Sequence, residues 1–148
     1  MNKAGTHFAT KPVMDGMKFD SKREMQFYAN FIKGKHRFEY HKKYPLFDKF
    51  AVGGMNMFGA SYTPDFVIYD ADGNVAHILD IKTGFSSSAI NSGIRLRFEL
   101  FARRYGKPVE IIVPATKTFR MKILGLTTPF EVRKFSNFDY TVFDLIGG

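Results

Sequence analysis

The spacing of hydrophobic residues predicts two helices in the chain. Apolar side chains in residues 21–33 recur at intervals of three, four and seven residues, which is the period of an amphipathic helix. Asp20 or Ser21 provides an N-cap, and Glu24 follows Ser21 by three residues, as in a capping box. The spacing predicts a second helix over residues 94–105, which a glycine and then a proline bring to an end.

Shorter apolar runs predict strands between and after these helices. Alternation and β-prone residues indicate strands over residues 36–47, 62–69, 75–82 and 109–113. Residues 70–74 contain an Asp-Gly pair, so the strands on either side of them form a hairpin. The order is helix, three strands, helix, strand, which is typical of an α/β domain with a mixed β-sheet flanked by helices.

Three segments lie outside this simple pattern. Residues 1–18 are polar, basic and contain glycine, so we expect a flexible basic arm before the core of residues 19–114. Residues 48–60 are rich in glycine and methionine, and they form either a wide hairpin loop or a twisted pair of strand ends. Residues 115–148 are expected to be a β-rich C-terminal extension of short strands and turns packed on the core, with FRMKILGL and DYTVFDLI as examples.

Composition limits the class of protein. A chain of 148 residues is the size of one domain. It has no cysteine, which excludes disulfides, thiolate metal sites and a thiol nucleophile, and which fits a reducing compartment. No apolar stretch has the length of a membrane span or of a signal peptide. We therefore expect no membrane partner and a cytoplasmic location.

The charge indicates a polyanionic partner. Lys and Arg number 22 against 14 Asp and Glu, which gives a net charge of +8, and residues 1–50 carry most of this excess. Such a balance favours nucleic acid as the partner. Charge alone fits equally well a basic protein with no such partner.

One set of charged residues suggests catalytic chemistry. Asp80 and Lys82 project from one face of their predicted strand, while Ile81 points into the core. Asp65, expected inside the other strand of the hairpin, lies across from them at a similar distance from the turn. Two such acids raise each other's pKa unless they share a cation, and Mg²⁺ accepts oxygen ligands. The backbone carbonyl of Ile81 adds a ligand, and Glu24 reaches the ion directly or through a water.

The chemistry that follows is phosphodiester hydrolysis. The metal ion lowers the pKa of a bound water, and the ammonium group of Lys82 orients that water and stabilises charge. Mn²⁺ can replace Mg²⁺ in such a site. Taken singly, Asp80 and Lys82 also fit a surface ion pair, and Glu24 fits a capping residue. The joint pattern in one basic chain favours the catalytic interpretation.

The same motifs resemble those of the PD-(D/E)XK nuclease superfamily. The match covers roughly residues 15–114 and rests on Glu24 with the segments YTPDF at 62–66 and DIKTG at 80–84. The chain looks most like the small endonuclease I-like phage proteins of the Holliday-junction resolvase type, and it is similar to an uncharacterised phage family of that kind.

The resemblance implies both a fold and roles for residues. The fold is an αβββαβ core like that of restriction endonucleases. By position, Asp65 and Asp80 are metal ligands, Lys82 is the catalytic lysine and Glu24 is the acid carried by the first helix. The implied activity is metal-dependent cleavage of DNA.

Further residues are candidates for contact with DNA, although each also fits a solvated surface or a plain linker. They are Lys22, Lys42, Lys43, Ser86, Ser87, Arg95, Arg97 and Arg104. Arg97 and Arg104 are seven residues apart, so they share a helix face. His36, His41 and His77 have no metal-ligand spacing and are expected to be structural or surface residues. The chain lacks the glycine-rich motifs of ATP or dinucleotide binding.

Three functions remain open from the sequence. The first is a metal-dependent DNA endonuclease selective for Holliday junctions or other branched DNA, acting as a homodimer because a junction needs two coordinated cuts. The second is a site-specific restriction or homing-type endonuclease with the same chemistry. The third is a non-catalytic DNA-binding or assembly protein on a nuclease fold.

Overall fold

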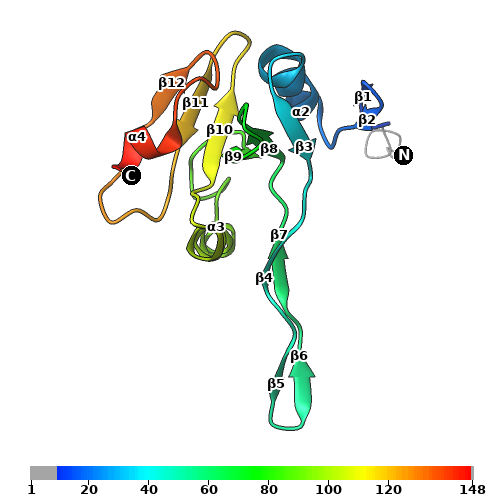
Figure 1. The fold of residues 1–148 in the computed structure, drawn as a ribbon, viewed down its shortest axis with the longest axis vertical. Helices are drawn as coiled ribbons and strands as arrows, with labels where there is room; N and C mark the ends of the chain where they lie inside the picture. Colours follow the sequence, from blue (N-terminus) through cyan, green and yellow to red (C-terminus); the bar gives the residue numbers. More distant parts are fainter. Residues whose placement is uncertain (1–9, 148) are drawn as a thin grey trace.

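A six-stranded sheet forms the centre of the molecule, which we describe from a computed structural model over residues 10–147 (Figure 1). Its strands are β3 (Arg37–Tyr40), β8 (Phe66–Tyr69), β9 (Val75–Ile81), β10 (Glu110–Pro114), β11 (Phe119–Lys122) and β12 (Arg133–Phe135). They lie in the order β12-β11-β10-β9-β8-β3, with β9 and β10 parallel and the other neighbours antiparallel. The expected α/β architecture with a mixed sheet is confirmed.

The helices follow the predicted positions closely. The first is α2 (Lys22–Phe27), which continues as the π-helical turn η1 (Tyr28–Ile32), and the second is α3 (Ser92–Tyr105). The Ser21 hydroxyl accepts a hydrogen bond of 3.1 Å from the backbone N–H of Glu24, and this bond caps α2. None of the helices within residues 10–147 is both long and apolar enough to cross a membrane.

The two faces of the sheet bury separate hydrophobic clusters. In β9, Leu79 belongs to the cluster beneath α2 and η1, whereas its neighbour Ile78 belongs to the cluster beneath α3. In β10, Ile112 and Ile111 divide in the same way. This alternation follows from the period of two in a strand, and it explains why these central strands are apolar at nearly every position.

Two of the predicted strands are each broken in two. The segment 36–47 forms β3 and then β4 (Tyr44–Phe47), because His41 takes a left-handed backbone conformation with φ of 58° that turns the chain out of the sheet. The segment 62–69 forms β7 (Ala60–Tyr62) and then β8, with residues 63–65 between them.

The broken strands continue into a projecting hairpin. β4 pairs with β7, and farther out β5 (Phe50–Val52) pairs with β6 (Met55–Met57). We call residues 44–62 the arm. Figure 1 shows it extending well away from the six-stranded sheet. Of the two interpretations of residues 48–60, the pair of strand ends is therefore the correct one.

Both ends of the chain add short elements. Residues 1–9 of the expected basic arm lie outside the described part of the chain. After them β1 (Val13–Met14) and β2 (Met17–Lys18) form a small hairpin, and the fully buried Phe19 follows. Residues 10–18 are therefore not the flexible N-terminal segment that the sequence predicted.

The C-terminal extension is only partly as expected. FRMKILGL includes β11, but DYTVFDLI contains α4 (Val142–Ile146) rather than a strand. Its apolar residues are spaced for one helical turn and pack on the cluster beneath α2, and a segment this short carries too little periodicity to separate helix from strand.

Candidate active site

The acidic residues gather where β8 begins and β9 ends. Asp65 was predicted to lie inside a strand, but it lies in the bend before β8. Its backbone N–H donates a hydrogen bond of 2.9 Å to the carbonyl of Leu79, which continues the β8–β9 ladder by one step. Its carboxylate then accepts a bond of 2.6 Å from the backbone N–H of Ile81. The hairpin therefore fixes Asp65 beside the end of β9.

Asp80 is the most enclosed acid of the group. Its side chain is 10% exposed and lies on the α3 face of β9. One oxygen accepts a 2.6 Å hydrogen bond from the hydroxyl of Tyr62, and the other lies 2.9 Å from the Nζ atom of Lys82. Asp80 and Lys82 share one face, as predicted, while Ile81 is buried in the opposite cluster. Burial beside the Asp80 carboxylate raises the pKa of Tyr62 well above its usual value, so Tyr62 stays a donor.

Glu24 enters the site from the first turn of α2. Its carboxylate accepts a 2.6 Å hydrogen bond from the hydroxyl of Tyr40, at the end of β3. The same hydroxyl accepts a hydrogen bond of 3.0 Å from the backbone N–H of Asp20. Tyr40 therefore ties the N-terminus of α2 to the edge of the sheet and directs the Glu24 side chain toward the acids of the hairpin.

These acids influence each other strongly. Burial, together with the negative charges of Asp80 and Glu24, raises the pKa of Asp65 from 3.8 to about 8. The hydrogen bond from Ile81 and the ammonium group of Lys82 oppose this rise without cancelling it. At pH 7 Asp65 therefore mostly keeps its proton, and a cation bound beside it would favour the ionised form.

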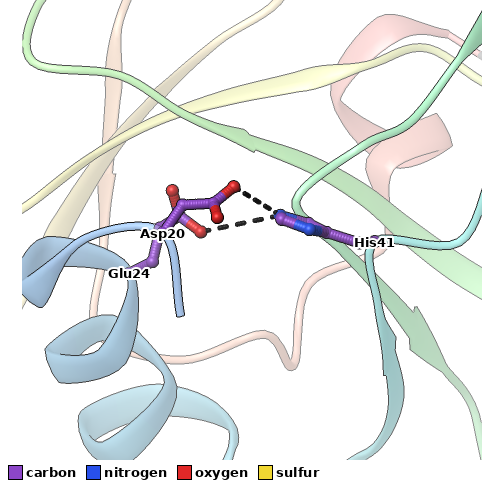
Figure 2. A group of neighbouring side chains, drawn as sticks. All are labelled: Asp20, Glu24 and His41. Carbon is purple, nitrogen blue, oxygen red and sulfur yellow. Dashed lines mark ion pairs between the residues drawn. The ribbon is translucent and has the colours of Figure 1, made fainter. Parts of the chain in front are cut away.

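His41 joins the site although its sequence position gave no indication of this. Its Nε2 atom lies 3.5 Å from Asp20, 3.8 Å from Glu24 and 3.7 Å from Asp65. The ring stacks on Tyr40 at a centroid distance of 3.7 Å, and the backbone N–H donates to the carbonyl of Asp65. Figure 2 shows the carboxylates of Asp20 and Glu24 facing the imidazole of His41.

Two groups of residues here have the donor atoms for a divalent ion. Within residues 10–147, Asp20, Glu24 and His41 each offer a ligand atom within 4.8 Å of the others. Asp65 and Asp80 form the second group, at the end of β9. Asp20 and His41 were both missed as site residues, because sequence spacing does not reveal that β3, the bend before β8 and α2 meet at one place.

The chain also matches a known protein family. Residues 5–120 match the family described as "Protein of unknown function (DUF1064)". The chain belongs to this family. No curated protein and no solved structure matches it. The DUF1064 match includes all the site residues, from Asp20 to Lys82, and the whole of the arm.

Within the same DUF1064 region lie the candidates for DNA contact, and the structure gives several of them internal partners. The guanidinium groups of Arg97 and Arg104 donate hydrogen bonds of 3.0 Å to the carbonyls of Ser61 and Pro45, at the base of the arm. We expected this shared helix face to contact phosphates, but its two arginines bind the base of the arm. Helical spacing identified the face but not what lies against it.

The remaining candidates lie at the surface. Arg95 forms an ion pair with Glu99, and Lys42 forms one with Glu39. The Ser86 hydroxyl is hydrogen-bonded to that of Ser88. The other three candidates are exposed. Those three are Lys22, Lys43 and Ser87. Of the other histidines His36 is partly exposed, and His77 is buried against Glu110 as a structural residue.

Proposed function

We propose that this chain is a metal-dependent DNA endonuclease of the PD-(D/E)XK superfamily. The observation that carries the proposal is the convergence of Asp65, Asp80 and Lys82 at the end of one hairpin, with Glu24 directed toward them from α2. These are the residue types that metal-assisted phosphodiester hydrolysis requires, in the order in which the superfamily motif has them.

The topology supports the same proposal. The elements α2, β3, β8, β9, α3 and β10 follow one another in the order αβββαβ that the resemblance implies. The arm is then an insertion between β3 and β8, and β11, β12 and α4 are an extension. The site lies at the end of the central hairpin of this core.

The donor set fits a hard divalent ion. Asp65, Asp80 and the backbone carbonyl of Ile81 would hold Mg²⁺, with Glu24 as a direct or water-linked ligand, and Mn²⁺ would substitute. The raised pKa of Asp65 supports this, because burial and the neighbouring acids raise it and a nearby cation would oppose both effects. When bound, the ion supplies charge neutralisation and activation of a water for attack on phosphorus.

The residues of the chain supply the remaining parts of the mechanism. Lys82 Nζ, held 2.9 Å from Asp80, orients the attacking water and stabilises charge that develops on the phosphate. Tyr62 fixes the Asp80 carboxylate from the buried side, and Tyr40 does the same for Glu24. His41 lies among the carboxylates and holds Asp20, Glu24 and Asp65 close together.

The partner we propose is DNA, and branched duplex in particular. The net charge of +8 suits a polyanion, and exposed Lys22 and Lys43 are proposed phosphate contacts. A junction requires two cuts, so we propose a homodimer with one site in each copy. Action in the cytoplasm, or in that of a host if the chain is phage-encoded, belongs to the same proposal.

A cleavage assay on a panel of substrates tests the proposal. The purified protein is given a four-way junction, a linear duplex of the same sequence and a single strand, each with Mg²⁺ and with EDTA. We expect paired cuts in the junction, dependent on Mg²⁺. Cutting of one linear sequence alone would instead support the site-specific endonuclease. Tight binding without cleavage under any divalent ion would refute the enzyme and leave a DNA-binding module.

A further inference from the structure

The arm carries most of the exposed apolar surface. Within residues 10–147, ten large hydrophobic side chains are strongly exposed, and six of them belong to this one hairpin. These six are Phe47, Phe50, Val52, Met55, Met57 and Phe58. The exposed fractions reach 74% for Met55 and 93% for Phe58, so the exposed apolar surface is concentrated in this hairpin.

The register of the hairpin places four of these side chains on one face. Phe50 lies directly opposite Met57, and Val52 lies opposite Met55, so all four project to the same side. Ala51, between Phe50 and Val52, projects to the other side. The outer arm is therefore amphipathic, with an apolar face that no other described part of the chain covers.

The arm is held firmly at its base. Arg97, Arg104 and Tyr105 of α3 all donate hydrogen bonds to backbone carbonyls of β4 and β7. The two strands cross closely at Gly59, where an added Cβ atom would lie 2.3 Å from the carbonyl oxygen of Phe47. In contrast, β5 and β6 pair only with each other, and an isolated two-stranded hairpin is marginally stable in water. The outer arm therefore needs a second layer.

Charge indicates what that layer is. The chain as a whole is strongly basic, yet residues 44–62 contain one acid and one base, Asp48 and Lys49. Such a neutral surface offers no attraction for the phosphates of DNA. Exposed methionine, phenylalanine and valine are instead typical of contacts between identical subunits. A contact across a two-fold axis must be self-complementary, and an apolar face beside one residue of each charge satisfies this requirement.

We propose that the apolar faces of two arms pack together and join two copies of this chain into a dimer. The four side chains of this face and Phe47, whose ring lies 5.9 Å from that of Phe50, offer roughly 500 Å² per copy, so two copies together bury about 1,000 Å², the lower limit for a specific interface. The arm connects His41 to Asp65 along the chain, so this contact also fixes the two candidate active sites relative to each other. The dimer belongs to the proposed function, but this surface is inferred from the arm alone.

Single cysteines test the surface directly, because the natural chain has none. Val52→Cys places a thiol on the apolar face, and the matched control Asn56→Cys places one on the opposite face. On mild oxidation without DNA or metal, we expect a disulfide-linked dimer from Val52→Cys and far less from Asn56→Cys. Equal crosslinking of the two variants would overturn the proposed face.

Sedimentation measures the assembly independently. At micromolar concentration we expect the natural chain to be a dimer and the double variant Phe50→Ser/Met57→Ser to be a monomer with a nearly unchanged melting temperature. A monomeric natural chain, or a dimeric double variant, would overturn the proposal. If the natural chain is monomeric and the double variant binds DNA less tightly, the arm is a DNA-contacting wedge instead. None of these readouts depends on cleavage, so they separate this proposal from the nuclease.

Discussion

Two buried acidic clusters lie on opposite faces of the sheet, and they differ in how their charges are satisfied. On the face away from Asp80, Glu110 is fully buried, with one oxygen 2.5 Å from the Tyr140 hydroxyl and the other 2.7 Å from Nδ1 of His77. Nε2 of His77 lies 3.3 Å from the carbonyl of Phe138. We call this the far cluster, and its polar atoms are fully paired without any added group.

In the candidate active site, hydrogen bonds within the protein do not fully stabilise the ionised form of the buried acids. Asp65 and Asp80 each have hydrogen-bond donors, yet burial and the nearby charges of Asp80 and Glu24 raise the pKa of Asp65 to about 8. The comparison teaches that burial of acids does not by itself indicate function. A buried carboxyl group that stays protonated near neutral pH, because burial and neighbouring acids oppose its ionisation, does indicate function, and it distinguishes the site from the structural Glu110 cluster.

The largest difference concerns catalysis. Lys82→Ala is expected to lower Mg²⁺-dependent DNA cleavage by ~10³-fold, because it removes the ammonium group that stabilises developing charge. DNA binding, measured by fluorescence anisotropy, should change little. The matched control Lys117→Ala, at an exposed lysine, should cleave normally. Retention of most activity by Lys82→Ala would contradict the assignment.

The far cluster should instead matter for stability. Glu110→Ala leaves His77 and Tyr140 buried without their shared partner, so the free energy of unfolding should fall by about 3 kcal/mol. Urea denaturation measures this. Glu99→Ala breaks an exposed pair with Arg95 and should cost less than about 0.5 kcal/mol. Equal free energies of unfolding for the two variants would show that the far cluster does not stabilise the fold.

The active site should show the opposite effect on stability. Since the pKa of Asp65 is raised from 3.8 to about 8 in the folded state, the metal-free protein should lose stability as pH rises through this interval. Asp65→Asn removes the loss and should stabilise the protein in EDTA at pH 8 by about 1–3 kcal/mol. The exposed Asp72→Asn is the control. A less stable Asp65→Asn protein under these conditions would contradict the electrostatic account.

The smallest effect is expected at His41. His41→Gln should lower the cleavage rate roughly tenfold, as expected for a residue that positions metal ligands. The same change at His36, which is partly exposed and packs near Phe138, should leave the rate unchanged. A full rate in His41→Gln would remove this residue from the site.

Local patterns were sufficient to predict much of this molecule. The period of the apolar residues located both long helices, and the Asp-Gly turn identified the hairpin that brings Asp65 beside Ile81. The side-chain alternation of a strand placed Asp80 and Lys82 together. Each of these inferences depends on residues close in sequence or related by one tight turn.

What was missed depends on contacts between distant segments. The left-handed backbone at His41 ends a strand whose sequence pattern continues, and it brings the imidazole to acids from two other elements. In the same way Arg97 and Arg104 bind carbonyls of the arm, whose position no local pattern reveals. Such residues become visible only when the register of the sheet is known.

The central claim is that the site is completed by a divalent cation, whereas the far cluster is complete as it stands. Anomalous diffraction from crystals soaked in Mn²⁺ tests this directly. The account predicts a manganese peak bonded to the carboxylates of Asp65 and Asp80, and none at Glu110. Crystals without a peak at Asp65 and Asp80, at a Mn²⁺ concentration that saturates the protein in solution, would contradict it.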